Sequence, residues 1–197
     1  MKFVLGEPPK NDFTPELHMW NELKEPKNAL VAQLIALPIG IFLIVFVYVL
    51  AIIITKFSGF SKSFSHPSEM IQYLIAMIII IPIHEILHAC VFPEGIKSKN
   101  TILGFWPKAC AFYGHYDGEM SRNRFIIVFL LPLISLSVFP IIAMGISGYI
   151  NTFVIRICLV NAFAACVDML GVILFATQVP KNAVVRNLGW KSYWIVK

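Results

Sequence analysis

Charged residues are scarce in this chain of 197 residues. Asp, Glu, Lys and Arg make up 14% of it, whereas hydrophobic residues make up 58% and the mean hydropathy is +0.76. About a quarter of the residues in an ordinary soluble domain are charged, and so short a chain cannot bury this much apolar surface inside itself. The shortage of charge therefore excludes an ordinary soluble domain and predicts an integral membrane protein.

Cysteine and dense basic runs are also lacking. The four cysteines form no CxxC pair and are too few for a disulfide scaffold, so we interpret them as small core residues. The net charge is +5, but the basic residues are spread beside hydrophobic stretches. We therefore expect them to direct membrane topology and to contact anionic lipid headgroups, and we expect no nucleic-acid partner.

Long hydrophobic runs are what the sequence does contain. Four stretches are long and apolar enough to cross about 30 Å of hydrocarbon as helices. We predict membrane spans at about residues 29–55, 69–92, 124–146 and 153–177. Three spans contain an internal proline that is expected to kink them: Pro38, Pro82 and Pro132. The predicted fold class is all-α integral membrane, with about four transmembrane helices.

The distribution of lysine and arginine predicts the orientation. Thirteen of the sixteen lie in the segment 1–28, in the loop between the second and third spans, and in the tail 180–197. By the positive-inside rule we expect these regions, and with them both termini, to be cytoplasmic. The chain then consists of a cytoplasmic N-terminal segment, a transmembrane domain over 29–179 and a cytoplasmic tail, as a multi-pass protein in contact with the lipid bilayer.

The loop between the second and third spans differs in kind from the helices. It reads TILGFWPKACAFYGHYD over 101–117, with two short aromatic, β-prone runs on either side of Pro107-Lys108. This pattern is more typical of a β-hairpin than of a helix. We expect a short hairpin at the cytoplasmic face, partly embedded in the membrane.

The second span contains the pattern His84-Glu85-Ile86-Leu87-His88. Residues four apart share one face of a helix, so the two imidazoles can hold one metal ion together. Glu85 lies one step round the helix, where it can take a proton from a water molecule that zinc activates. A purely structural polar cluster is the alternative. Two imidazoles and a carboxylate are costly within hydrocarbon, which favours a functional metal site.

A catalytic zinc ion needs a third protein ligand and one open position. Asp168 is the only acidic residue in the interior of the other three spans. His84 and Asp168 each lie fifteen residues from the start of their span, and both helices run in the same direction, so they are expected at nearly the same depth. In the alternative interpretation, Asp168 pairs with Arg156 or caps a water site.

Asn161 lies two helical turns before Asp168 on the same stripe. It is a candidate for orienting substrate or stabilising an oxyanion, or for joining helices by a hydrogen bond. Among other ligand candidates, Glu94 occupies the third-ligand position of an extended HExxH pattern but follows Pro93. His115, and the acidic residues that follow it in the loop, can equally be surface residues.

Several of these residues together resemble a known group. The pattern HEILHA in a span, an Asn…Asp pair in a later span, and GFWPKACAFY followed by RFIIVFLLPLISL are similar to the putative zincin peptidase family of membrane proteins, over roughly residues 70–195. That family is regarded as distantly related to the site-2 protease metalloproteases. The resemblance implies His84, His88 and Asp168 as ligands of one Zn²⁺ and Glu85 as the catalytic base.

The sequence thus predicts a zinc metalloprotease that hydrolyses peptide bonds within or next to the membrane, with a peptide or transmembrane protein as substrate. A non-enzymatic alternative is a membrane metal-binding protein that senses or carries a divalent ion. A pseudoenzyme would ordinarily have lost Glu85 or a ligand, and all of them are present.

Overall fold

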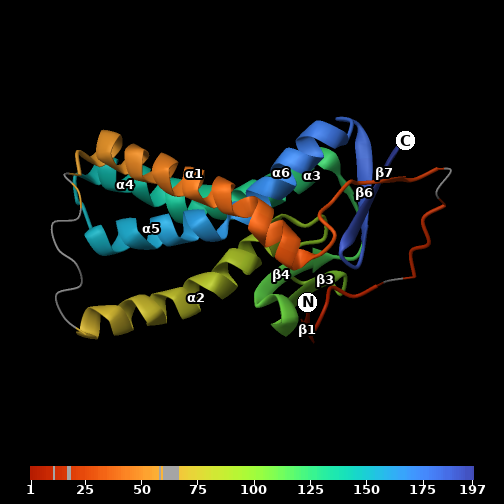
Figure 1. The fold of residues 1–197 in the computed structure, drawn as a ribbon, viewed down its shortest axis with the longest axis horizontal. Coiled ribbons are helices and arrows are strands. Elements are labelled where there is room, and N and C mark those ends of the chain that lie inside the picture. The colour runs from red at the N-terminus through yellow and green to blue at the C-terminus, as the bar shows by residue number, and fades with distance from the viewer. Residues whose placement is uncertain (11, 17–18, 58, 60–66) are drawn as a thin grey trace.

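Long apolar helices and two small sheets make up the computed structural model of the chain (Figure 1), which describes all residues except 11, 17–18, 58 and 60–66. A π-helical turn, η2 (Ile134–Val138), joins the third and fourth helices. The helices are α1 (Ala29–Thr55), α2 (Pro67–Val91), α3 (Arg122–Leu133), α4 (Phe139–Ser147), α5 (Thr152–Ala164) and α6 (Cys166–Gln178).

Three helices are long and apolar enough to cross a membrane: α1, α2 and the continuous helix 122–147 formed by α3, η2 and α4. They correspond to the first three predicted spans. The fourth predicted span, 153–177, is two helices that meet at an angle of 46°, and together they make a fourth crossing if they form one span. The break lies at Ala165, whose ψ of 8° departs from helical values although no proline or glycine marks the site.

One sheet has three strands in the order β1-β3-β4. Strands β3 (Thr101–Trp106) and β4 (Ala111–Tyr116) form an antiparallel hairpin across a short 3₁₀ turn, η1 (Pro107–Ala109), so the expected hairpin between the second and third spans is present. Strand β1 (Lys2–Leu5) pairs in parallel with β3.

A second, antiparallel sheet has the order β2-β7-β6-β5. Its strands are β2 (Asn21–Glu22), β5 (Glu119–Ser121), β6 (Ala183–Leu188) and β7 (Lys191–Val196). An all-α fold class is therefore incomplete: the chain is mainly helical, with two sheets. The sequence does not predict β2 and β5, because they have only two and three residues and their partner strands lie far away in the sequence.

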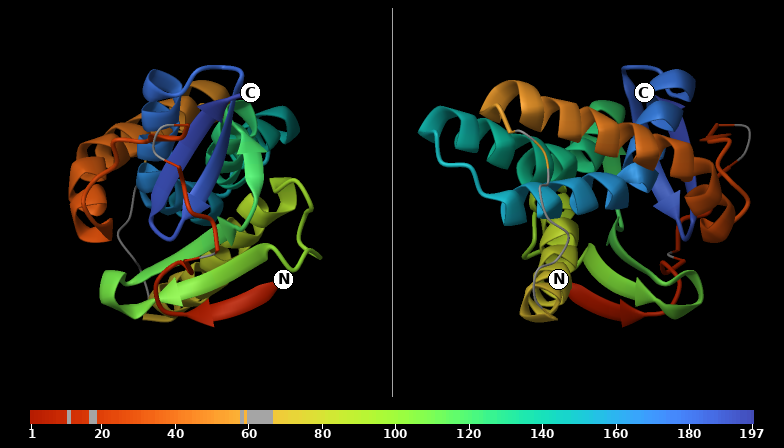
Figure 2. Two further views of the ribbon diagram at one scale, coloured as in Figure 1. Left: turned by 90° about the vertical axis from the view of Figure 1, so that its right-hand side faces the viewer. Right: turned by 60° about the vertical axis from the view of Figure 1, so that its left-hand side comes forward.

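The N-terminal segment takes part in both sheets. The Gly6 N–H donates to Phe105 O in β3 (2.9 Å), and the Leu23 N–H donates to Ser192 O in β7 (2.9 Å). Both sheets and both termini lie at the same end of the helices (Figures 1 and 2). The three regions that carry most of the basic residues are therefore on one side of the helical part.

Helix α1 packs closely on α5 and α6 because small residues line its inner face. A Cβ atom at Gly40 would lie 2.8 Å from the Phe163 ring, so only glycine permits this approach. Helix α2 runs along one side of the bundle (Figure 1). Its outer surface is rich in exposed isoleucine and leucine, as expected of a helix that faces lipid: Ile71, Leu74, Ile75, Ile78, Ile79 and Ile83.

Candidate metal centre

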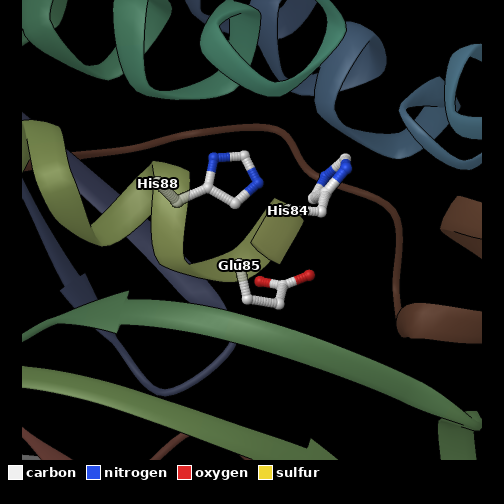
Figure 3. A group of neighbouring side chains, drawn as sticks. All are labelled: His84, Glu85 and His88. Carbon is white, nitrogen blue, oxygen red and sulfur yellow. The ribbon is translucent and has the colours of Figure 1, made fainter. Parts of the chain in front are cut away.

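His84 and His88 project from the same side of α2, and both are buried. Figure 3 shows the two imidazoles directed away from the three-stranded sheet, while the Glu85 carboxylate points toward a strand of it. One potential ligand atom from each of the three residues lies within 4.8 Å of the others. The spacing of four residues therefore has the structural effect that the sequence predicts.

Asp168 completes the group from the first turn of α6. Its Oδ2 lies 2.9 Å from His84 Nε2, and its Oδ1 lies 3.4 Å from His88 Nε2. Arg156, its alternative partner, lies elsewhere and donates from Nη1 to the Tyr73 hydroxyl at 3.2 Å. The equal depth of His84 and Asp168, inferred from residue counting, thus corresponds to direct proximity.

A backbone carbonyl sets the orientation of the His88 ring. Nδ1 of His88 lies 2.8 Å from the carbonyl oxygen of Val128 in α3. A carbonyl only accepts, so Nδ1 carries the hydrogen and donates it. In the neutral ring, Nε2 then presents a lone pair toward Asp168.

Asn161 performs the same task for His84. Its Nδ2 donates to Pro132 O (3.2 Å) and to Ser137 Oγ (2.9 Å), and because Pro132 O only accepts, this fixes the amide with Oδ1 facing His84. His84 Nδ1 lies 3.0 Å from that oxygen and must donate to it. The Nε2 atom of His84 therefore also presents a lone pair toward Asp168.

The donor set fits a zinc ion. The Nε2 atoms of His84 and His88 lie 2.9 and 3.4 Å from the Asp168 carboxylate, where protonated rings would form ion pairs with it. In the neutral rings both Nε2 atoms are lone-pair donors, and a metal cation between them and the carboxylate takes the place of the protons. Zinc bound tetrahedrally at about 2.0–2.1 Å from each ligand holds neighbouring donor atoms about 3.3 Å apart. Three protein ligands also leave the fourth position for water or substrate, as in catalytic zinc sites.

The positioning of Asn161 bears on its predicted role. Its side chain is 2% exposed, and both hydrogens of its amide nitrogen are used, by Pro132 and Ser137. The amide joins α2, α3, η2 and α5 behind the His84 ring. This geometry favours the orientation of a ligand and the joining of helices over contact with an oxyanion.

Glu85 lies between the histidine pair and strand β4. The Gly114 N–H donates a hydrogen bond to the Glu85 carboxylate. A Cβ atom at Gly114 would lie 3.4 Å from His88 Cβ and 3.7 Å from Glu85 Oε2, so the strand backbone passes directly beside the helix. The carboxylate is thereby held beside the two histidines, in a group of three side chains that could hold a metal ion.

Strand β4 is a terminal strand of its sheet in the described part of the chain. Backbone groups along a strand point alternately to its two sides. Because Gly6 donates to Phe105 O, the even-numbered residues of β3 bond to β4, and Gly104 is paired with Tyr113. The N–H and C=O groups of Phe112, Gly114 and Tyr116 therefore point to the free edge.

A cavity of about 460 Å³ contains the His84, Glu85, His88 and Asp168 side chains in its wall. All six residues of β4 line it, which is expected if the cavity follows the free edge of that strand. Its other walls come from α3, α6, the N-terminal segment and the β6–β7 hairpin, which includes Trp190.

Of the remaining candidates, Glu94 and Asp117 have partners other than the three proposed ligands, whereas His115 lines the same cavity as those ligands. Glu94 accepts hydrogen bonds from Ser98, Asn100 and Tyr116, which together hold its pKa below the usual range. His115 is 4% exposed in β4, so it is not a surface residue, and burial lowers its pKa. Asp117 lies 3.8 Å from Arg186.

Sequence analysis did not identify Val128, Ser137 or Gly114 as part of the site. Val128 and Gly114 contribute backbone atoms, which no side-chain pattern reveals. Ser137 lies in the π-helical turn η2, where it donates to Cys158 O (2.8 Å) and accepts from Asn161. A π-helical turn often occurs at a functional site, but no feature of this sequence predicts one here.

Comparison with known proteins adds one finding. A family model described as "Putative zincin peptidase" matches residues 77–184, which is more than half of the chain. The matched range contains the two histidines, Glu85, Asn161 and Asp168. Neither the curated proteins nor the solved structures contain a match to this chain.

Proposed function

Because the chain belongs to the putative zincin peptidase family, we propose that it is a membrane-embedded zinc metalloprotease that hydrolyses peptide bonds within or next to the membrane. One observation carries the proposal. The Nε2 atoms of two histidines face one aspartate, and the carboxylate of Glu85 lies beside the histidine pair.

His84, His88 and Asp168 would hold one zinc ion. Bound there, the ion would polarise the carbonyl of the scissile peptide bond and lower the pKa of a bound water molecule. Val128 O and Asn161 hold the two rings so that their Nε2 atoms face Asp168 and the proposed zinc position. Glu85 takes the proton of the attacking water and then delivers it to the leaving amine. The Gly114 N–H orients the Glu85 carboxylate for both transfers.

The membrane setting is supported by α1, α2 and helix 122–147, each long and apolar enough to cross a bilayer. Two of the proposed ligands, His84 and His88, lie in the C-terminal part of α2, and that end of the helix lies beside the sheets (Figure 1). We propose that this end is cytoplasmic, so that both termini are cytoplasmic and the reaction takes place in the cytoplasmic half of the membrane.

The substrate we propose is a peptide or a transmembrane protein segment held in extended form along the free edge of β4. That edge offers the N–H and C=O groups of Phe112 and Tyr116 for strand pairing, while the Gly114 N–H between them is bonded to Glu85. The cavity follows the same edge and reaches Glu85 and the ligands. Pairing there would present an extended peptide bond, which is more open to attack than one in a helix.

The Glu85→Gln variant tests this function, with Glu94→Gln as matched control because Glu94 lies outside the site. Purified proteins in lipid nanodiscs would receive a defined mixture of transmembrane peptides, with zinc content measured by mass spectrometry of the metal and products by mass spectrometry of the peptides. We expect about one zinc in all three proteins, and a 10²- to 10⁴-fold loss of cleavage in Glu85→Gln alone.

Two results would contradict the proposal. Cleavage by Glu85→Gln at the rate of the unchanged protein would remove Glu85 as the base. One bound zinc without cleavage of any peptide by the unchanged protein would instead support a non-enzymatic metal-binding protein.

A further inference from the structure

The three-stranded sheet has one apolar face. Paired residues on neighbouring strands share a face, and Phe3 pairs with Leu103, while Leu5 pairs with Phe105, which in turn pairs with Phe112. The Phe105 and Phe112 rings lie 4.6 Å apart, as expected for one face. We call Phe3, Leu5, Leu103, Phe105 and Phe112 the apolar sheet face.

Helix α2 covers only one end of this face. It lies over Gly114, whose Cβ position is 3.4 Å from His88 Cβ, and the nearby Phe92 and Tyr116 rings are 5.5 Å apart. Away from the helix the face is uncovered: Leu5 is 72% exposed, Phe3 is 67% exposed and Phe112 is 42% exposed. An exposed cluster of this kind on a sheet indicates an interaction surface.

The uncovered part adjoins the outer flank of α2. Around the helix, His84 and Ile86 lie on opposite sides of Glu85, which points at β4. Helix α2 packs against both β4 and β3. Ile83 and Ile86 lie on the flank of the helix that faces away from the two histidines, and both are exposed. The apolar surface of the helix therefore continues onto the apolar sheet face.

The charges around this face complement a membrane surface. None of its five residues is charged, and lysines follow in the chain at both ends of the hairpin: Lys108 in its turn, and Lys97 and Lys99 in the loop before β3. Anionic headgroups attract lysines at this position relative to an inserted apolar surface.

We propose that the apolar sheet face lies on the lipid bilayer, with its side chains among the acyl chains near the headgroups and Lys97, Lys99 and Lys108 at the headgroups. Strand β1 then acts as a membrane-contacting strand that the N-terminal segment adds to the hairpin. The inference rests on the membrane placement in the proposed function and is independent of the zinc chemistry. It places the edge of β4 at the level where a polypeptide leaves the hydrocarbon.

Fluorescent labels on single cysteines test the contact in nanodiscs of phosphatidylcholine and phosphatidylglycerol. Cys90→Ala and Cys110→Ser first remove the two exposed thiols. Labels then go on Phe3→Cys and Leu5→Cys, with Lys2→Cys as the control on the opposite face and Ile78→Cys, 71% exposed on α2, as the control for the span. Phe112→Cys is a further site on the same face in case a β1 variant fails to fold.

Quenching by lipids with brominated acyl chains and by aqueous iodide separates the outcomes. We expect labels at 3, 5 and 78 to be quenched at least twofold more by the lipid than the label at 2, and iodide to quench mainly the label at 2. The inference would be overturned, with the membrane placement intact, if iodide quenched the labels at positions 3 and 5 as strongly as the label at position 2 while lipid still quenched the label at position 78. Iodide quenching of 78 as well would overturn the membrane placement. Protection of 3 and 5 from both quenchers would show that protein, such as a second copy, covers the face, and would also overturn the inference.

Discussion

The amide oxygen of Asn161 lies 3.0 Å from Nδ1 of His84, on the side of the imidazole that faces away from Asp168. This places an uncharged, fully buried group behind a proposed metal ligand. Because Pro132 O and Ser137 Oγ fix the direction of the amide, its oxygen faces His84, and Nδ1 of the ring carries the hydrogen that it donates to Asn161.

Replacing Asn161 by Ala should weaken metal binding without abolishing it. The variant leaves the Nδ1–H of His84 without its acceptor, so the ring loses both its fixed tautomer and its orientation. Loss of such a supporting contact typically costs about 10- to 100-fold in metal affinity. Competition with a fluorescent zinc chelator measures the dissociation constant.

Ser137→Ala serves as the matched control for Asn161→Ala. It removes one acceptor of the Asn161 amide but leaves Pro132 O to hold it. We expect a smaller loss of affinity than for Asn161→Ala. Equal affinities in Asn161→Ala and the unchanged protein would show that Asn161 only joins helices.

Replacing Asp168 by Ala should remove most of the bound zinc. The two histidines alone provide too few ligands for a stable site, and the carboxylate is the only negative charge in the proposed ligand set. The metal content of protein purified in parallel gives the measurement, with Asp117→Asn as control because Asp117 pairs with Arg186 outside the site. An unchanged zinc content in Asp168→Ala would exclude Asp168 as a ligand.

Replacing Phe112 by Pro should impair substrate binding through the backbone. Proline is tolerated on an edge strand but removes the N–H that Phe112 directs to the free edge of β4. One lost hydrogen bond of about 1 kcal/mol corresponds to a roughly fivefold rise in KM. Phe112→Ala, which keeps the N–H, is the control, and zinc content should be the same in both. Equal KM values in the two variants would argue against strand pairing at this edge.

Replacing Glu25 by Gln should change how stability depends on pH. Glu25 accepts hydrogen bonds from the Ser192 N–H and hydroxyl, both at 2.8 Å, yet burial raises its pKa from 4.5 to about 7. Lys191 opposes this rise and Glu22 adds to it, through their charges. Because the folded-state pKa is the higher one, the folded chain binds the proton more tightly than the unfolded chain.

The contribution of Glu25 to stability therefore falls as the pH rises. The stabilisation by protonated Glu25 is complete below about pH 4.5 and is lost as the pH rises through about 7, with a total of roughly 3 kcal/mol. Thermal unfolding in nanodiscs between pH 5 and 8 should therefore show a fall in Tm for the unchanged protein. Glu25→Gln should show a smaller fall. Parallel curves for the two proteins would mean that Glu25 titrates normally.

Much of the helical part can be predicted from the sequence because lipid imposes a simple requirement. A run of apolar residues that must satisfy its own backbone forms a helix, and α1 begins and ends at the predicted residues 29 and 55. The proximity of His84 and Asp168 is predictable for the same reason, since helical rise converts residue counts into depth.

The second sheet, the pairing of β1 with the predicted hairpin and the bend at Ala165 are not predictable in this way. Strand β2 has two residues, and its partner β7 lies at the other end of the chain, so no local sequence pattern predicts that they pair. The bend at Ala165 contains no proline or glycine, and tertiary contacts decide it. The contact of the Val128 carbonyl with His88 is not predictable either, because in the sequence Val128 is an ordinary apolar residue of a helix.

The two strands of the N-terminal segment also set the order in which the molecule can be completed. Lys2 pairs opposite Ile102, and Asn21 pairs opposite Trp194, so the first strands synthesised wait for partners made much later. Contacts between such distant residues form slowly because a long loop must close first. Two walls of the cavity, the N-terminal segment and the β6–β7 hairpin, are therefore assembled only once synthesis reaches the last strand. A growing chain carries its histidines and Asp168 into the membrane before the walls of the cavity around them are complete.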